Sequence, residues 1–369
     1  NRLDKKELET LITNGIESTR YLAVDESRML ADPARYYKGG KPDLQLFDKK
    51  LYEVNPDDKV AIARAAAEEV LGKDERIISV DSSYSDGEGS SYRLISNGFE
   101  GESKSTWFSV SASVSIKGEG EARPQDYWYD SALFYDKLTK TGIGAKALER
   151  GLRKLGQKKA KSGKYTMVVD PMNVGNLLSP MLSALYGSAL QQKNSFLMDK
   201  LDTKVASDLF TLRDEPHAIG ANGSRYFDNE GVATEPRTVF DKGVLKTYFI
   251  DTYNGKKMDI APTISAPSRL ILTPGDKDLN GLVADIKQGI LVTGFNGGNS
   301  NSSTGDFSYG IEGFLIEDGK LTQPVNEMNV TGNMVTLWNS LVAVGNDPQP
   351  NRSWQIPSLV FEGVDFSGL

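Results

Sequence analysis

The chain of 369 residues contains no cysteine and only one histidine, His217. This scarcity excludes a disulfide framework, an iron–sulfur cluster and a thiol nucleophile, and it leaves a structural zinc site without its Cys and His ligands. A Ser-His-Asp triad would have to use His217. The fold must therefore rest on a buried apolar core, for which a hydrophobic content of 38% is ordinary.

The charge balance and the absence of long apolar runs limit the kinds of binding partner and the cellular location that we expect. The 43 Lys and Arg against 50 Asp and Glu give a net charge of −7, which disfavours direct binding to nucleic acid or to an anionic membrane. No apolar run approaches the ~20 residues of a membrane span, and no signal peptide is visible. We therefore expect a cytoplasmic protein. Because the chain opens at Asn1 without a Met, we also expect that its native first segment is missing.

Three helices are expected in the first half. The first covers Lys5 to Ile16, where apolar residues recur at helical spacing. The second follows a cap at Asn55, has Pro56 in its first turn and ends at Gly72. The third covers residues 143–155. The apolar face predicted for the second helix comprises Val60, Ala63, Ala67, Val70 and Leu71.

Strands are expected between residues 76 and 138. From Trp107 to Ile116, apolar residues alternate with serines, a pattern that predicts a half-buried strand whose serine face meets water or a partner. Asp86-Gly87 and Asn97-Gly98 are both typical of hairpin turns. These signals predict an antiparallel meander.

A basic, polar stretch separates the two halves, with six Lys and Arg residues between Arg153 and Lys164. A nucleic-acid patch is one interpretation. A solvated linker is favoured, because the stretch lacks interleaved aromatic residues and the chain is acidic. We predict an N-terminal domain over residues 1–157, a linker over 158–164 and a C-terminal domain over 165–369.

The second half should be mostly β with one core helix. Tyr165 to Val169 predicts a short buried strand. Apolar residues then recur at helical spacing from Val174 to Ala189, which predicts a core helix that Pro180 kinks or interrupts. Short strands and turns should follow, with one helix near residues 279–289. The predicted fold class is therefore α+β in two domains.

His217 is open to two interpretations, because it follows two carboxylates, Asp214 and Glu215. It could be a general base with a raised pKa. The favoured alternative is an exposed or salt-linked loop residue, since no nucleophile can be assigned beside it. Common catalytic signatures such as the P-loop, G-x-S-x-G and H-E-x-x-H are absent.

Two further segments are rich in polar residues that could bind an ion or a peptide. Asp228-Asn229-Glu230-Gly231 could hold a divalent cation, but Asp and Asn before Gly also form a self-hydrogen-bonded turn, which is favoured. The Gly-, Asn- and Ser-rich segment 293–310 could line a peptide or anion site. It could equally be a flexible hairpin tip.

A series of segments in the second half together resembles the TldD/PmbA family, known as modulators of DNA gyrase. Each segment is weak alone, and the order and spacing of all of them carry the resemblance. The segments are Arg225–Gly231, Lys242–Tyr248, Leu272–Gly275, Asn301–Ser308, Gly313–Gly319, Gln323–Glu327, Gly332-Asn333 and Val344–Asp347. Members of this family usually begin with a further N-terminal α/β segment.

One branch of this family, the TldD type, resembles a metallopeptidase with H-E-x-x-x-H on a helix and a Cys near its C-terminus. Two His grip the zinc while the Glu activates its water. On the matching helix, Ser179 and Ala184 stand where the two His would be, and Pro180 stands where the Glu would be. The resemblance is thus to the PmbA branch, also called TldE, and implies no catalytic residue, metal or cofactor in this chain.

The resemblance implies a non-catalytic subunit that pairs with a zinc-bearing TldD-type subunit. Such a protease would act on unfolded peptides, including peptide-antibiotic precursors and antitoxins, through a groove that accepts a strand. The candidate contacts with a peptide or with the partner are the serine face of residues 107–116 and the loop residues Asn301, Thr304, Gly305, Asp306 and Ser308.

Two alternatives belong to other classes of protein. The chain could be a homodimeric binding protein that modulates a toxin–antitoxin or gyrase pathway without proteolysis. Less favoured is an independent hydrolase that holds a hard cation on carboxylates such as Asp228, Glu230 or Asp306.

Overall fold

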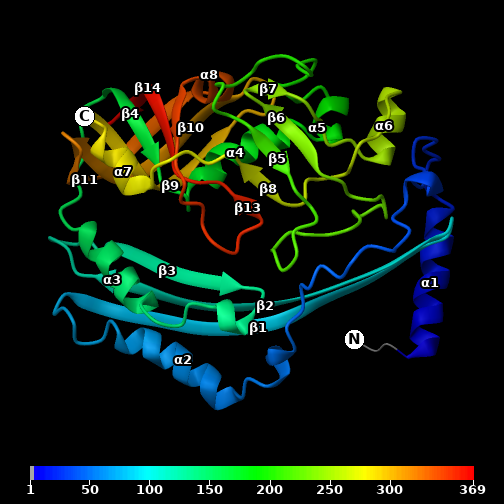
Figure 1. Ribbon diagram of the computed structural model, residues 1–369, viewed down its shortest axis with the longest axis horizontal. Helices are drawn as coiled ribbons and strands as arrows, with labels where there is room; N and C mark the ends of the chain where they lie inside the picture. Colours follow the sequence, from blue (N-terminus) through cyan, green and yellow to red (C-terminus); the bar gives the residue numbers. More distant parts are fainter. Residues whose placement is uncertain (1–3) are drawn as a thin grey trace.

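The structure, a computed structural model, describes residues 4–369, so the first three residues of the predicted N-terminal domain lie outside it. An N-terminal part (residues 4–155) has helices packed on an antiparallel sheet, and a C-terminal part (residues 163–369) is β-rich (Figure 1). The predicted α+β class is confirmed. Within residues 4–369, no helix is both long enough and apolar enough to span a membrane.

The three helices predicted for the first half are present. They are α1 (Lys5–Thr19), α2 (Pro56–Glu68) and α3 (Ile143–Arg153). Asn55 caps α2 as predicted, because its Oδ1 accepts the backbone N–H of Asp58 at 2.9 Å. The helix α1 buries none of its residues, so its apolar stripe faces solvent.

The apolar face predicted for α2 is wrong in part. Ala66 and Val70 are fully buried, whereas Val60 and Leu71 are 56% and 58% exposed. The helix packs on the sheet through Ala66, with Ile62 partly buried in the same cluster, and Val60 and Leu71 lie outside that contact.

The predicted meander is confirmed as a three-stranded antiparallel sheet of β1 (Ile77–Ile95), β2 (Phe99–Ile116) and β3 (Gln125–Ala132). Asn97-Gly98 forms the β1–β2 turn as predicted, with Gly98 at a φ of +109°. The turn predicted at Asp86-Gly87 is wrong, because β1 runs straight through it. Gly87 lies opposite Trp107, and a Cβ there would be only 3.0 Å from the indole.

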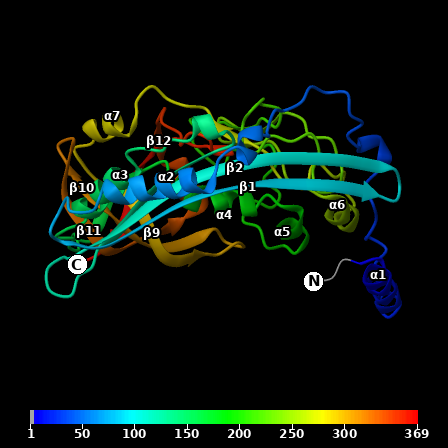
Figure 2. The same cartoon turned by 90° about the horizontal axis from the view of Figure 1, so that it is seen from below.

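The alternation in β2 separates two faces of this sheet. Its apolar residues, such as Val110 and Val114, are buried against α2 and α3. The serine face is turned toward the C-terminal part. Ser111 pairs with Tyr129 on β3, and the guanidinium of Arg352 lies 4.8 Å from the Tyr129 ring. In both ribbon views the β1–β2 hairpin runs along the C-terminal part and reaches the end of the molecule where α1 lies (Figures 1 and 2).

A closed barrel forms the centre of the C-terminal part. Its strands are β4 (Gly163–Val169), β9 (Gln288–Ser300), β10 (Asp306–Glu317), β11 (Lys320–Asn333) and β14 (Leu359–Ser367). They pair in the order β11-β10-β9-β4-β14, and a β11–β14 pairing closes the ring. Strand β12 (Leu341–Val344) adds to β14. The predicted strand at 165–169 is confirmed within β4.

A second, smaller sheet packs beside the barrel. It has the order β13-β8-β5-β6-β7, and its strands are β5 (Leu212–Asp214), β6 (Arg237–Asp241), β7 (Val244–Leu245), β8 (Leu270–Leu272) and β13 (Trp354–Gln355). The expectation of short strands holds for this sheet and is wrong for β9, β10 and β11, which have 12 to 14 residues each.

The core helix between these sheets is divided into α4 (Val174–Ser183) and α5 (Gly187–Gln191). Its apolar residues, including Leu177 and Met181, are fully buried. Pro180 lies inside α4, and the break comes after Ser183 rather than at the proline. The remaining helices are α6 (Thr252–Met258), α7 (Leu279–Ala284) and α8 (Met334–Asn339). Of these only α7 was predicted, and it ends before β9 begins at Gln288.

Candidate functional site

The three positions matched to a metal-binding motif lie near the end of α4. Ser179 is exposed, Pro180 is half-buried, and Ala184 is completely buried. Ala184 is the C-cap residue, and its N–H donates to the carbonyl of Pro180 at 3.1 Å. An exposed hydroxyl and a buried methyl group cannot converge on one cation. The residues present therefore do not fit a zinc ion.

The structure brings the end of α4 next to the predicted contact loop through a short connecting segment. The hydroxyl of Ser195 donates to the carbonyl of Ala184 at 2.6 Å. One residue later, the N–H of Phe196 donates to the carbonyl of Ser302 at 3.0 Å. The helix end, residues 194–196 and the β9–β10 turn therefore form one continuous region, which we call the α4 site.

The β9–β10 turn is an ordered hairpin connection. The N–H of Asn301 donates to the carbonyl of Asp306 at 2.7 Å. The N–H of Gly305 donates to the carbonyl of Asn301 at 2.8 Å. The side-chain Oδ1 of Asn301 accepts from Ser303 N at 2.9 Å and from Thr304 N at 3.2 Å. Most polar groups of the turn are thus satisfied within the turn itself.

Side chains outside the turn fix its position. The amide of Asn333 donates to Asp306 Oδ1 at 3.0 Å and to the carbonyl of Thr304 at 2.8 Å. Hydrogen bonds from Asn333 and Thr304 lower the pKa of Asp306. Asn194 Oδ1 accepts from the hydroxyl of Ser302 at 2.7 Å. No sequence signal marked Asn194, because its partner lies 108 residues away.

Four of the five predicted contact residues therefore meet in one turn: Asn301, Thr304, Gly305 and Asp306. The fifth, Ser308, lies further along β10, opposite Asn299, and is exposed. Contact of these residues with a peptide or with a partner stays a prediction.

His217 is a packed loop residue. Its Nε2 lies 3.1 Å from the hydroxyl of Thr234, and its ring centroid lies 5.0 Å from that of Tyr226. Burial and the charge of Lys41 lower its pKa, and these effects outweigh those of Glu235 and Glu215. The hypothesis of a base with a raised pKa is therefore wrong.

The carboxylates at 228–230 organise the backbone. Asp228 is buried, and its two oxygens accept the N–H groups of Glu230, Val232 and Ser265 at 2.9 to 3.0 Å. This arrangement confirms the predicted turn. The carboxylate of Glu230 accepts from the N–H and the hydroxyl of Thr252 at the start of α6, and burial raises its pKa.

The cation hypothesis finds no support in this arrangement. Asp306 lies in the α4 site and Asp228 in a separate turn, and both are engaged by hydrogen bonds. Across residues 4–369, no group of three or more His, Asp or Glu side chains could hold a metal ion.

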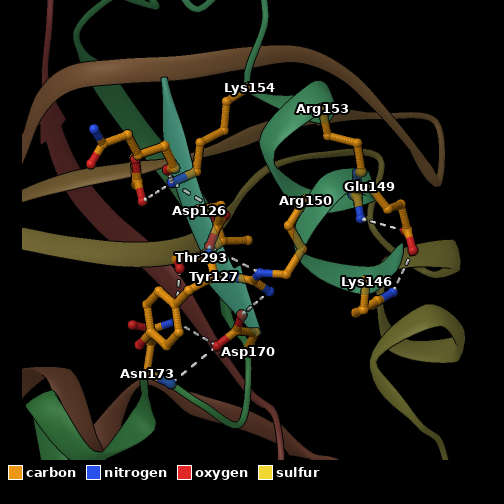
Figure 3. Close-up of polar contacts among 12 residues, drawn as sticks. Asp126, Tyr127, Lys146, Glu149, Arg150, Arg153, Lys154, Asp170, Asn173 and Thr293 are labelled. Carbon is orange, nitrogen blue, oxygen red and sulfur yellow. Dashed lines mark hydrogen bonds and ion pairs between the residues drawn. The ribbon is translucent and has the colours of Figure 1, made fainter. Parts of the chain in front are cut away.

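A second polar region, at the junction of the two parts, is centred on α3 (Figure 3). Lys154 is buried, and its Nζ lies 2.7 Å from Glu312 Oε1 on β10 and 3.2 Å from Asp126 Oδ2 on β3. Arg150 Nε donates to Asp126 Oδ1 at 3.2 Å. Lys154 was assigned to the solvated basic stretch, and for this residue the interpretation is wrong. Its partners come from distant strands, which local charge patterns cannot reveal.

Asp170 joins this junction from the end of β4. It is 4% exposed, and its Oδ1 accepts from the N–H of Asn173 at 3.0 Å and from the Asn173 amide at 2.7 Å. Burial raises the pKa of Asp170 to about 6, although Asn173 and Arg150 act in the opposite direction.

Comparisons with known proteins relate this architecture to one family. The family profile of the PmbA/TldA metallopeptidase C-terminal domain matches residues 162–368, and that of the central domain matches residues 49–155. The Metalloprotease PmbA homolog of Haemophilus influenzae is 29% identical over 98% of this chain and 81% of its own length. The Metalloprotease PmbA of Escherichia coli O157:H7 is 27% identical over 96% of this chain and 78% of its own length.

Solved structures agree with these matches. A crystal structure from Bacteroides thetaiotaomicron, described as a candidate modulator of DNA gyrase, is 73% identical, with a TM-score of 0.99 over 100% of this chain and 84% of its own. TldE from Thermococcus kodakarensis shares the fold, with a TM-score of 0.81 at 22% identity over 99% of this chain and 85% of its own. With two family profiles covering most of its residues, the chain belongs to the PmbA/TldD metallopeptidase family.

Proposed function

We propose that this chain is the non-catalytic, PmbA/TldE-like subunit of a two-subunit metalloprotease and that a TldD-type chain supplies the zinc and the catalytic residues. One observation carries the proposal. The chain belongs to a metallopeptidase family, yet it has no cysteine and one histidine, and that histidine lies outside α4.

The α4 site supports the loss of metal chemistry. Ser179 and Ala184 offer no imidazole, and they lie on different sides of the helix end, one exposed and one buried. Curated relatives are named metalloproteases, and a pair of unequal subunits reconciles that name with a chain that lacks the ligands. The partner's zinc would polarise the scissile carbonyl and activate water.

We further propose that the substrates are unfolded peptides, such as peptide-antibiotic precursors and antitoxins, and that the complex is cytoplasmic. The β9–β10 turn and the exposed Ser308 beside it would contact the peptide or the partner. The turn is held in place by hydrogen bonds with Asn333 and Asn194, and a rigid surface loses little entropy on binding.

Three parallel reactions test the proposal with a fluorogenic, unstructured peptide: this chain alone, a TldD-type partner alone, and an equimolar mixture. We expect no cleavage by this chain, weak cleavage by the partner and at least tenfold faster cleavage by the mixture. The control is a mixture whose partner has the motif Glu replaced by Gln, which should be inactive. Equal rates for the partner with and without this chain would refute the proposal.

A homodimeric binding protein that modulates a gyrase or antitoxin pathway is the second candidate. The observation that favours it is the exposed apolar stripe of α1, in which Leu11 and Ile12 are 68% and 60% exposed. Native mass spectrometry of this chain with and without the TldD-type partner separates the two candidates. A homodimer that persists unchanged beside the partner supports the second.

A further inference from the structure

A cleft of about 500 Å³ lies between α3 and the C-terminal part, away from the α4 site. The helix α7 lies near α3 in both ribbon views (Figures 1 and 2), and residues of both helices line the cleft. Small-molecule sites in proteins have volumes of this order. The cleft lining contains three cationic and three anionic side chains, so its formal charge is balanced.

One wall of the cleft is cationic. Lys146, Arg150 and Arg153 follow one another at i, i+4 and i+7 on α3. Lys146 and Arg153 extend toward Glu149, whereas Arg150 extends toward Asp126 and Asp170 (Figure 3). Arg150 is engaged by Asp126 at 3.2 Å. Lys146 and Arg153 share a single exposed carboxylate, Glu149, at 2.8 and 3.8 Å. These two cations are therefore only partly neutralised, and both are 40% exposed.

A second wall of the cleft is acidic and includes Asp170 and Asp278. The side chain of Asp170 is 6% exposed, and its Oδ2 lies 3.9 Å from the guanidinium of Arg150. That distance is too long for a hydrogen bond. Asp278 caps α7 by accepting the N–H of Gly281 on Oδ1, and its other oxygen has no partner in the described chain. Asp278 is exposed, so water reaches this oxygen, and the ammonium group of a ligand would replace that water.

The third anionic side chain, Asp347, is already satisfied. It accepts the N–H of Leu279 at 3.0 Å and both the N–H and the hydroxyl of Ser358 at 2.9 and 2.8 Å. Between the charged walls the cleft is lined by aliphatic side chains, among them Val283, Leu291 and Leu321.

We propose that this cleft binds short peptides through both of their free ends. The terminal carboxylate pairs with Lys146 and Arg153, the terminal ammonium pairs with Asp170 and Asp278, and one apolar side chain lies on the aliphatic surface. A simple anion or cation would be attracted by one wall and repelled by the other. A dipolar ligand gains from both, since each wall then supplies charge-assisted hydrogen bonds.

This site uses side chains of this chain alone and needs no partner subunit. It goes beyond the proposed function, because a site for free peptide ends recognises cleaved products rather than the interior of an unfolded chain. The cleavage test above and the binding test below can therefore fail independently.

The binding test is calorimetric titration of the full chain with the dipeptide alanyl-leucine and with its N-acetylated, C-amidated and doubly capped forms. We expect each single cap to weaken binding about tenfold, because it removes one charge-assisted contact. The doubly capped form should bind weakest. Equal affinity for all four forms, or no saturable binding of the free dipeptide at millimolar concentration, would overturn the proposal.

Two substitutions test which wall of the cleft binds which end of the dipeptide. Arg153→Gln should weaken alanyl-leucine binding about tenfold and leave the C-amidated form unchanged. Asp278→Asn, which keeps an N-cap residue, should weaken the free dipeptide and leave the N-acetylated form unchanged. Arg123→Gln, at a 41% exposed residue outside the cleft lining, is the matched control. Thermal melts confirm that each variant is folded. Unchanged affinity in both wall variants would overturn the assignment.

Discussion

Arg150 and Asp170 face each other across the junction of the two parts at 3.9 Å, Nη1 to Oδ2, without a hydrogen bond between them. The guanidinium is held closer to Asp126, at 3.2 Å. The pairing is therefore too weak to offset the burial of Asp170, and burial raises the pKa of that carboxyl to about 6.

Asp170→Asn should change how stability depends on pH. The folded chain binds the Asp170 proton more tightly than the unfolded chain, whose ordinary value is 3.8. The stability that this group contributes is therefore full below about pH 4 and is lost as the pH rises to about 6. Relative to the Asn variant, the native chain should lose on the order of 1–3 kcal/mol across this window. Urea denaturation at successive pH values measures the difference.

Asn173→Ala tests the same pKa shift by removing a hydrogen-bond donor to Asp170. The Asn173 amide donates to Asp170 Oδ1 at 2.7 Å and lowers its pKa. Removing this donor should raise the pKa of Asp170 further, so that the loss of stability extends to higher pH. A flat difference curve between the native chain and Asp170→Asn would contradict the whole interpretation.

Lys154→Met should be strongly destabilising. The Lys154 side chain is 9% exposed and holds Asp126 and Glu312, which are 5% and 17% exposed. Removing a buried cation leaves carboxylates without compensation, at a cost of about 3–5 kcal/mol. Lys159→Met is the control, since Lys159 pairs with Glu327 at 3.5 Å with both side chains exposed. Its expected effect is below about 1 kcal/mol. Similar effects of both variants on the urea midpoint would contradict a buried network.

Local signals predicted those elements whose causes are local. Asn55 and Pro56 begin a helix because a side-chain cap and a fixed φ act within one turn. The strand at Trp107–Ile116 was predicted because one face of a sheet repeats every two residues. The same reasoning failed at Asp86-Gly87, where the glycine accommodates the Trp107 indole rather than a turn.

The candidate site was predictable only in part, because several of its contacts join residues that are far apart in the sequence. The β9–β10 turn was found from its composition, but the residues that hold it, Asn194 and Asn333, are separated from it in sequence. Lys154 and Glu312 lie 158 residues apart, and the partner of a buried charge cannot be found from local sequence. The helices α6 and α8 were not predicted. They have seven and six residues, which is short for a helical period, and α7, also of six residues, was predicted only as part of the longer stretch 279–289.

Asn301→Ala should loosen the β9–β10 turn. The Asn301 side chain accepts the N–H groups of Ser303 and Thr304, and the substitution leaves both without this partner. The expected cost is about 1–2 kcal/mol in free energy of unfolding. Asn299→Ala is the control, because this residue lies exposed on the neighbouring strand β9. Hydrogen exchange at residues 301–306 should accelerate in Asn301→Ala and stay unchanged in the control. An unchanged exchange rate in both variants would show that the side chain does not hold the turn.

Gly101→Ala should disturb the contact between the β1–β2 hairpin and the C-terminal part. A Cβ at position 101 would lie 2.6 Å from the Phe99 ring and 2.9 Å from the Phe227 ring, so one ring must move. Overpacking of this kind costs about 1–3 kcal/mol. Gly89→Ala is the matched control on the same hairpin, since its Cβ would meet only the Ser105 hydroxyl, at 3.9 Å. Thermal melts should show a lower Tm for Gly101→Ala and no loss for Gly89→Ala, because alanine is favoured over glycine in a strand. Equal melting temperatures would show that the Phe99–Phe227 contact is loose enough to admit a methyl group.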